Sequence, residues 1–159
     1  MGETRWLNER EQRAWRAVQF MHMRLTARLN RELAATSDLS GQDYAVLVAL
    51  TDRPDGRMRL FELAHDLGWE RSRVSHQITR MARRDLVTKD KDCPSDRRGA
   101  FVVVSPLGRK AIEAAAPGHV EAVRRLFIDR LTPHQLDVIG KAAATILAAL
   151  DEEPDDHAD

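Results

Sequence analysis

The stretch that decides the fold is WERSRVSHQITRMARRD, residues 69–85. It holds five arginines and a histidine, yet an apolar residue returns every three or four positions, which is the period of an amphipathic helix. One predicted face is apolar and consists of Val74, Ile78, Met81 and Ala82. The opposite face is polar and consists of Arg73, His76, Gln77, Arg80 and Arg84. The stretch therefore predicts a helix that packs through one side and presents a basic side outward.

The residues before this helix predict a second, shorter one. Leu60, Leu63, Ala64 and Leu67 recur at helical spacing, and Gly68 follows at once. Glycine is favoured where a helix ends in the left-handed conformation. Two short helices joined by a tight turn, the second rich in arginine, are typical of a helix-turn-helix.

The side chains of the polar face suit the major groove of DNA. Arginine can bridge guanine O6 and N7, and glutamine can pair with adenine. Ser72 and Ser75 lie near the positive N-terminal end of the helix, where hydroxyls and amides can bind phosphates. The alternative is an ordinary amphipathic helix with a solvated basic face. The glycine turn before the helix and the basic segment after it favour DNA binding.

That basic segment predicts a β-hairpin. Residues 86–91 and the β-branched run at 100–104 flank the sequence DCPSDRRG, residues 92–99. A basic loop beside a groove-reading helix can insert an arginine into the minor groove, which makes Arg97 and Arg98 candidates. A solubilising turn is the alternative. A carboxylate repels phosphate, so we expect Asp96 to pair with an arginine and organise the tip.

Helices are predicted on both sides of this central region. Residues 7–33 lack glycine and proline and carry apolar residues at helical spacing, which predicts one long helix. Ser40 and Asp43 form a partial capping box for a short helix that ends at the turn 52–56. The pairs Ser105-Pro106 and Thr132-Pro133 are typical starts of two later helices. We expect a kink or short break at residues 117–118, and disorder in the acidic tail, residues 151–159.

The composition bounds the class of protein. The 159 residues are 43% hydrophobic and 31% charged, which is typical of a soluble globular chain. No apolar run is long enough for a membrane span or a secretory signal, so we expect a cytoplasmic protein with no membrane partner. The net charge is zero, but residues 70–110 hold eleven basic and five acidic residues, whereas residues 111–159 hold four and ten. This segregation points to a binding partner, and accidental clustering of charges on solvated faces is the alternative.

Catalytic and metal chemistry find little support. The sequence shows no nucleophile with a base at usable spacing, no glycine-rich phosphate loop and no carboxylate pair on a shared apolar face, so we predict that the protein is not an enzyme. The histidines at positions 65, 119 and 134 share no ligand spacing, and no metal or cofactor is expected. Cys93 is the only cysteine; it excludes an intramolecular disulfide, and we interpret it as a passive thiol rather than a redox switch.

These motifs together resemble the MarR family of winged-helix regulators. The resemblance rests on WERSRVSHQITRM, Leu86-Val87, the sequence Asp96-Arg97-Arg98-Gly99, VVVSPLGRKAI and LTPHQL, and it extends over about residues 8–150. It implies a mainly α fold with a small β-hairpin wing. It also implies a winged helix-turn-helix lobe at residues 40–104 and a helical dimerisation region at residues 7–35 and 105–150. Asp85 departs from the family, which usually has glycine there, but aspartate tolerates the left-handed conformation well.

The resemblance also implies roles for individual residues. By position it assigns base or phosphate contacts to Ser72, Arg73, Ser75, His76 and Arg80, and a minor-groove contact to Arg98. Many members of the family are released from DNA by small molecules or by oxidation. Trp15 and His22 lie where an effector crevice would open, although core packing explains a tryptophan equally well.

The hypothesis from sequence is a homodimeric, sequence-specific DNA-binding transcriptional regulator. We expect a MarR-type repressor with a palindromic operator, double-stranded DNA and a second copy as partners, and a small molecule as a candidate effector. Two alternatives stay open: a metal-responsive regulator on the same scaffold, and a winged-helix module that binds protein. Salt separates DNA binding from an apolar protein interface, because phosphate contacts weaken steeply as salt rises.

Overall fold

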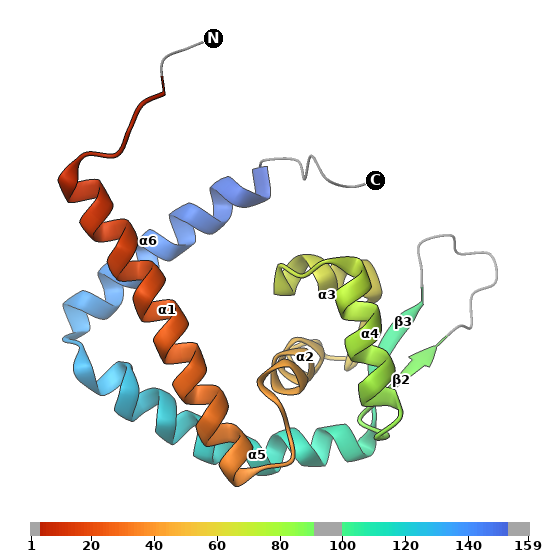
Figure 1. Ribbon diagram of the computed structural model, residues 1–159. Helices are drawn as coiled ribbons and strands as arrows, with labels where there is room; N and C mark the ends of the chain where they lie inside the picture. Colours follow the sequence, from red (N-terminus) through yellow and green to blue (C-terminus); the bar gives the residue numbers. More distant parts are fainter. Residues whose placement is uncertain (1–3, 91–99, 153–159) are drawn as a thin grey trace. The chain divides into compact units, whose positions relative to one another are not determined.

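The computed structural model describes residues 4–90 and 100–152 (Figure 1). The chain divides into two compact units, Met1–Val120 and Glu121–Asp159, and each is described by itself. The wing-tip residues named above, namely Cys93, Asp96, Arg97 and Arg98, lie outside the described residues. Among the residues that are described, no helix has the length and apolar character needed to cross a membrane.

The first unit is mainly helical, with one small sheet. Its elements in chain order are α1 (Glu9–Thr36), α2 (Gly41–Thr51), β1 (Arg57–Arg59), α3 (Leu60–Leu67), α4 (Arg71–Ala82), β2 (Val87–Asp90), β3 (Phe101–Val104) and most of α5 (Pro106–Leu126). The strands are antiparallel in the order β1-β3-β2. The predicted fold class, mainly α with a β-hairpin wing, is confirmed.

The predicted helix starts are confirmed by their capping bonds. The amide of Asp43 donates to the Ser40 hydroxyl at 3.1 Å, and the amide of Ser40 donates to the Asp43 carboxylate at 2.9 Å. The amide of Gly108 donates to the Ser105 hydroxyl at 2.9 Å. These bonds satisfy donors that the first turn of a helix leaves without a partner. Local sequence signals therefore fix where α2 and α5 begin.

A left-handed turn joins α3 to α4. Gly68 has φ 61° and ψ 35°, and the amide of Trp69 donates to the carbonyl of Ala64 at 2.9 Å. An added Cβ at Gly68 would meet no atom within 4 Å, so the backbone conformation alone favours glycine there. Asp85, at the turn from α4 to β2, also has a positive φ, of 56°. The predicted helix-turn-helix is confirmed.

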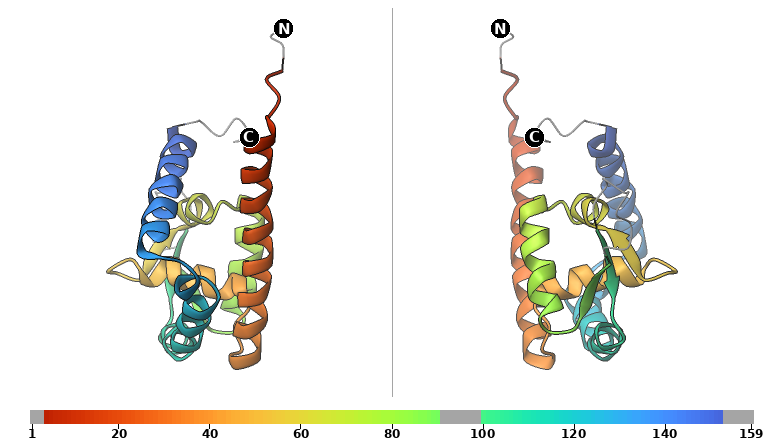
Figure 2. Two further views of the ribbon diagram at one scale, coloured as in Figure 1. Left: turned by 90° about the vertical axis from the view of Figure 1, so that its left-hand side faces the viewer. Right: turned by 90° about the vertical axis from the view of Figure 1, so that its right-hand side faces the viewer.

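The core of the first unit lies among α2, α3, α4 and the sheet. Val74, Ile78 and Met81 of α4 are fully buried, as the apolar face of the helix predicted. The buried residues that they join include Val46, Leu47, Leu50, Leu63 and Val102. In the right-hand view of Figure 2, α4 lies to the left of the sheet. Burying the apolar face of α4 thus leaves most of the polar face exposed.

One glycine lets α5 approach the sheet closely. A Cβ built on Gly108 would lie 2.0 Å from the carbonyl oxygen of Leu86, a distance that no real Cβ contact allows. The amide of Ser105 donates to that same carbonyl at 3.2 Å. The first turn of α5 therefore rests directly on the backbone that leads into β2.

Strand β1 was not predicted from the sequence. Its three residues pair with β3, with Arg57 opposite Val103, Met58 opposite Val102 and Arg59 opposite Phe101. Met58 is 1% exposed and joins the core. The predicted hairpin strands are confirmed as β2 and β3.

The second unit contains the end of α5, the short helix η1 (Ile128–Arg130) and α6 (Pro133–Glu152). Thr132 and Gln135 form the predicted capping box, with the Gln135 amide donating to the Thr132 hydroxyl at 3.2 Å. A kink or short break was predicted at residues 117–118; helix α5 is continuous through Pro117, so the break is wrong and the kink stays a prediction. Helix α6 extends to Glu152, two residues into the tail that was predicted to be disordered; residues 153–159 lie outside the described part.

Candidate nucleic-acid interface

The outer face of α4 carries a compact set of polar and basic side chains. Ser72, Arg73, His76 and Arg80 are exposed, and Ser75 is half-buried. Their spacing of three or four residues gathers them on one side of the helix. The structure therefore brings together five of the six α4 residues that the sequence singled out for DNA binding.

The N-terminus of α4 has amides available for an anion. The N-cap is Glu70, whose side chain makes no capping hydrogen bond. The first amide that bonds within the helix is that of Val74, which donates to the carbonyl of Glu70 at 3.0 Å. The amides of the preceding turn point along the helix axis toward solvent, as helix geometry requires. Together with the helix dipole, they favour a phosphate at this end.

An aromatic ring supports Arg73. The guanidinium carbon of Arg73 lies 4.5 Å from the centroid of the Trp69 ring, within the range of a cation–π contact. Trp69 is half-buried and packs against the core. Its ring therefore acts as a fixed platform that restricts where the arginine head can lie.

Gln77 is not part of the exposed face. Its side chain is 2% exposed, and its Nε2 donates to Oδ1 of Asp43 at 2.7 Å. The prediction that Gln77 lies on the exposed stripe and contacts DNA is wrong, because this amide points toward α2 and is already hydrogen-bonded. A helical projection could not reveal this, since the partner lies 34 residues earlier in the chain.

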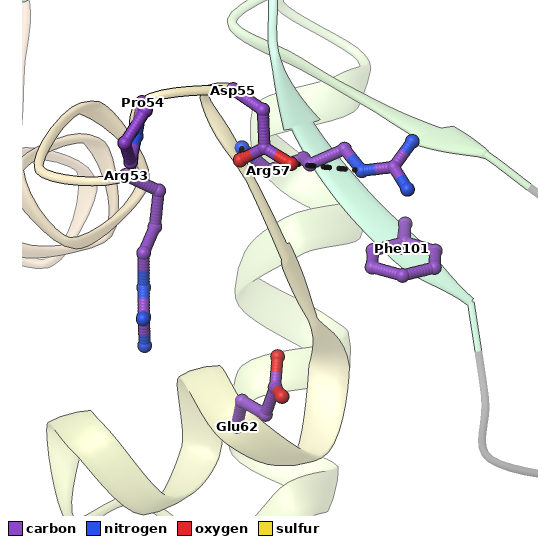
Figure 3. Close-up of a pocket in the computed structure, with 6 residues that line it drawn as sticks. All are labelled: Arg53, Pro54, Asp55, Arg57, Glu62 and Phe101. Carbon is purple, nitrogen blue, oxygen red and sulfur yellow. Dashed lines mark hydrogen bonds and ion pairs between the residues drawn. The ribbon is translucent and has the colours of Figure 1, made fainter.

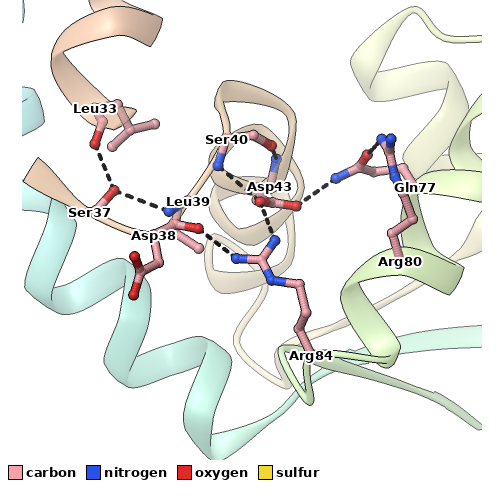
Figure 4. Close-up of polar contacts among 9 residues, drawn as sticks. All are labelled: Leu33, Ser37, Asp38, Leu39, Ser40, Asp43, Gln77, Arg80 and Arg84. Carbon is pink, nitrogen blue, oxygen red and sulfur yellow. Dashed lines mark hydrogen bonds and ion pairs between the residues drawn. The ribbon is translucent and has the colours of Figure 1, made fainter. Parts of the chain in front are cut away.

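Asp43 is a functional candidate, although its sequence pattern indicates only a helix cap. It is 3% exposed and binds residues from two other segments (Figure 4). Nη1 of Arg84 donates to its Oδ2 at 2.7 Å, and Nη2 of Arg84 donates to the carbonyl of Asp38 at 2.6 Å. Arg84 is exposed, as the helical projection predicted, and it also joins the turn after α4 to α2 and to the segment that precedes α2.

The carboxyl of Asp43 is held in its ionised form. Burial alone would raise its pKa, but hydrogen bonds from the Ser40 amide, from Arg84 and from the Ser40 hydroxyl, together with the charge of Arg84, bring the pKa below its ordinary value. An ionised carboxylate only accepts hydrogen bonds. Each neighbour of this side chain must therefore present a donor.

The second strand connects to α4 through a polar contact. Nζ of Lys89, on β2, donates to the Thr79 hydroxyl at 3.0 Å. This bond joins the back of α4 to the strand that leads into the wing. The wing residues predicted to meet DNA, Arg97 and Arg98 with Asp96 as organiser, lie outside the described residues, so their predicted roles stay predictions.

A shallow depression of about 480 Å³ lies beside β1 (Figure 3). Its lining residues are Arg53, Pro54, Asp55, Arg57, Glu62 and Phe101. Both arginines are already engaged: Arg57 pairs with Asp55 at 3.2 Å and lies 4.2 Å from the Phe101 ring centroid, and Arg53 pairs with Asp66 at 3.4 Å. These contacts stabilise the edge of the sheet.

The residues considered for small-molecule binding lie on α1. Trp15 is 57% exposed, and His22 is exposed as well. Neither residue lines the depression beside β1. A second depression lies between α2 and α3, and neither residue lines that one. Ligand binding by Trp15 and His22 therefore stays a prediction.

The histidines do not form a metal site in the described part of the chain, where no group of three or more His, Cys, Asp or Glu side chains could hold an ion. His119 instead packs against Tyr44, with ring centroids 4.4 Å apart. Its Nδ1 is buried without a hydrogen-bond partner, and burial lowers the pKa of this imidazole.

Solved structures with closely similar folds are regulators of transcription. AbsC, a MarR family transcriptional regulator from Streptomyces coelicolor, is 41% identical, with a TM-score of 0.84 over 94% of this chain and 100% of that one. Sco3205, a MarR family transcriptional regulator from the same organism solved in complex with DNA, is 36% identical, with a TM-score of 0.87 over 97% and 96% of the two chains.

A more distant structure shares the fold alone. BpsR from Bordetella bronchiseptica, whose DNA binding is regulated by 6-hydroxynicotinic acid, is 21% identical, with a TM-score of 0.72 over 84% of this chain and 98% of that one. No protein-family model matches the sequence, and no curated protein matches it.

Proposed function

Because the chain belongs to the MarR family of transcriptional regulators, we propose that this DNA-binding regulator acts as a homodimeric repressor that recognises a palindromic operator. The observation that carries the proposal is the exposed, basic face of α4. This helix belongs to a winged helix-turn-helix, and its opposite face is buried in the core.

Helix α4 reads the major groove. Arg73 and Arg80 are the candidates for guanine, because a guanidinium can donate to O6 and N7 together. His76 lies between them on the exposed face. Ser72 and Ser75, near the N-terminus of the helix, bind phosphates together with the free amides of the first turn. Phosphate contacts supply affinity, and the two arginines supply base preference.

The wing reads the minor groove. Strands β2 and β3 carry Arg97 and Arg98 on the segment between them, and the contact of Lys89 with Thr79 joins β2 to α4. An arginine in a narrow minor groove is attracted by its enhanced negative potential. Arg98 is assigned to the groove and Asp96 to holding the wing in shape.

Exposed apolar side chains on the terminal helices provide the dimer contact. Along α1, large apolar side chains are exposed at Trp15, Val18, Phe20, Met21 and Met23. In the second unit, every residue of α6 except Leu136 is exposed, and the apolar ones include Val138, Ile139, Ile146, Leu147 and Leu150. Apolar surface on this scale is typical of an interface. We assign residues 7–35 and 105–150 to dimerisation and residues 40–104 to DNA binding.

Two-fold symmetry then sets the operator. A symmetric dimer places its two recognition helices in successive major grooves, so the half-site centres should lie about 10 base pairs apart in an imperfect palindrome. A small molecule that releases the protein from DNA is the proposed inducer, by analogy with BpsR and its regulation by 6-hydroxynicotinic acid.

The test is a binding titration with two DNA fragments. The fragment upstream of the protein's own gene is compared with an unrelated fragment of equal length, at two salt concentrations. We expect tighter binding to the first fragment, and affinity that falls steeply with salt as phosphate contacts are lost. Equal binding to both fragments, or binding that does not respond to salt, would contradict the proposal.

A further inference from the structure

We propose that Asp43 is a positioning residue for DNA recognition: acting through Gln77, it holds the guanidinium of Arg80 in place on the exposed face of α4. The inference rests on the proposed function, because it concerns how a base-reading side chain is held. Asp43 itself lies on α2 and is buried, so it touches no DNA.

Asp43 and Gln77 form a buried polar pair. Asp43 is 3% exposed and Gln77 is 2% exposed, and these two are the buried polar residues in the described part of the chain. Burial of a charge and an amide is unfavourable unless each group has its hydrogen bonds. Here both carboxylate oxygens are used: Oδ1 accepts from Gln77 Nε2 at 2.7 Å, and Oδ2 accepts from Arg84 Nη1 at 2.7 Å.

The second step is the orientation of the amide. An ionised carboxylate cannot donate, so Gln77 must turn its NH₂ group toward Asp43. Its carbonyl oxygen Oε1 then faces away from Asp43. There it accepts a hydrogen bond from Nη2 of Arg80 (Figure 4). The charge on Asp43 thereby selects the one amide orientation that can hold Arg80.

The third step is the effect on Arg80. An exposed arginine samples many rotamers, and a DNA contact must immobilise it at an entropic cost. The bond to Gln77 restricts the guanidinium before DNA arrives and uses one of its five N–H donors. The remaining donors stay available for a base. Preorganisation of one such side chain corresponds to a gain in affinity of about threefold to tenfold.

The variant Asp43→Asn removes the selection of one orientation of the Gln77 amide. Asparagine has nearly the same shape, but it can present either its oxygen or its NH₂ group to Gln77. The Gln77 amide is then free to reverse, and a reversed amide repels the Arg80 guanidinium. We expect the affinity for operator DNA to fall about threefold to tenfold, with little change in affinity for a scrambled duplex.

A double-mutant cycle separates positioning from general structural damage. The DNA probes are the tightest duplex that the wild-type protein selects from a random-sequence library and a scrambled duplex of equal length. Asp43→Asn is measured alone and in the Arg80→Ala background, where it should cause no further loss. The matched control is the Arg73→Ala background, since Arg73 rests on Trp69 and lies outside the network. There the full loss should remain.

Each outcome has a distinct meaning. If Asp43→Asn weakens binding by the same factor in the Arg80→Ala background, the residue acts only by supporting the fold and the inference is overturned. If the wild-type protein binds the selected and scrambled duplexes equally, the proposed function itself has failed. If Asp43→Asn shows no cooperative thermal unfolding, Gln77→Met takes its place in the same cycle. Gln77→Met leaves the Asp43–Arg84 pair intact. It should likewise weaken DNA binding in the Arg73→Ala background and cause no further loss of affinity in the Arg80→Ala background.

Discussion

Arg73 lies over the indole of Trp69, with its guanidinium carbon 4.5 Å from the ring centroid. The two residues flank the start of α4, so a half-buried ring from the turn supports a solvent-facing charge on the helix. The platform is rigid because Trp69 packs against the core.

Trp69→Leu should weaken operator binding about twofold to fivefold, because an exposed cation–π contact is worth about 0.5–1 kcal/mol. Trp69→Phe keeps an aromatic face and should lose less. The measurement is a fluorescence anisotropy titration of labelled operator DNA, with thermal unfolding of both variants as a control. If phenylalanine and leucine reduce affinity equally, the ring does not support Arg73.

Arg73→Ala and Arg98→Ala should change the DNA sequence preference in different ways. Loss of Arg73 should relax base preference at one position of each half-site by about 1–3 kcal/mol, because a bidentate base contact is removed. Loss of Arg98 should weaken binding mainly where A·T-rich sequence narrows the minor groove. A panel of operator duplexes with single base-pair changes measures both effects. Uniform, sequence-independent losses from both variants would contradict the division of labour between helix and wing.

Ile146→Asp should dissociate the proposed dimer. Ile146 is 61% exposed on the apolar face of α6, and a carboxylate left in an apolar interface costs about 2 kcal/mol or more, which raises the dimer dissociation constant at least about thirtyfold. Sedimentation equilibrium measures the change. Lys141→Asp, which also places an acid on α6, is the control and should stay dimeric. An unchanged constant for Ile146→Asp would exclude this face from the interface.

His119 should make stability depend on pH. Its pKa is lowered by burial from the ordinary 6.5, so the folded protein favours the neutral imidazole more than the unfolded chain does. The stability that this contributes is present above pH 6.5 and is lost as the pH falls through the lower folded-state pKa. His119→Phe keeps a ring against Tyr44 and removes the unpaired Nδ1.

We therefore expect the free energy of unfolding of the wild type, measured in urea, to decrease relative to His119→Phe as the medium is acidified from about pH 7.5 to about pH 5. The control variant His134→Asn, at an exposed position, should follow the wild type. Parallel pH profiles for the wild type and His119→Phe would show that the folded state does not disfavour the charged imidazole.

Much of the fold could be predicted because its signals are local. A serine followed three residues later by an acceptor located the start of α2, and a glycine at a helix end located the turn into α4. Strand β1 carried no such signal: its three residues become a strand only by pairing with Val102 and its neighbours, more than forty positions later. Pairing over that distance cannot be read from a short window.

The candidate site was predictable to the same extent. The period of α4 identified which face packs and which is exposed, and five of the six residues chosen on α4 lie on its outer face. Gln77 was wrongly placed on the exposed face because it lies at the border between the two faces. At this border a tertiary contact determines whether a side chain is buried or exposed. The buried carboxylate of Asp43 binds the Gln77 side chain and so keeps it buried. The capping pattern at Ser40 gave no indication that Asp43 has these further partners.

The close approach at Gly108 has a genetic consequence. Any side chain there would push against the carbonyl of Leu86, which is backbone and cannot rotate away. The residues of α4 that are proposed to contact DNA lie elsewhere and would keep their chemistry. A strain that carries Gly108→Ala should therefore be temperature-sensitive: its target genes stay controlled at low growth temperature and lose control on warming, although every residue that is proposed to meet the operator is unchanged.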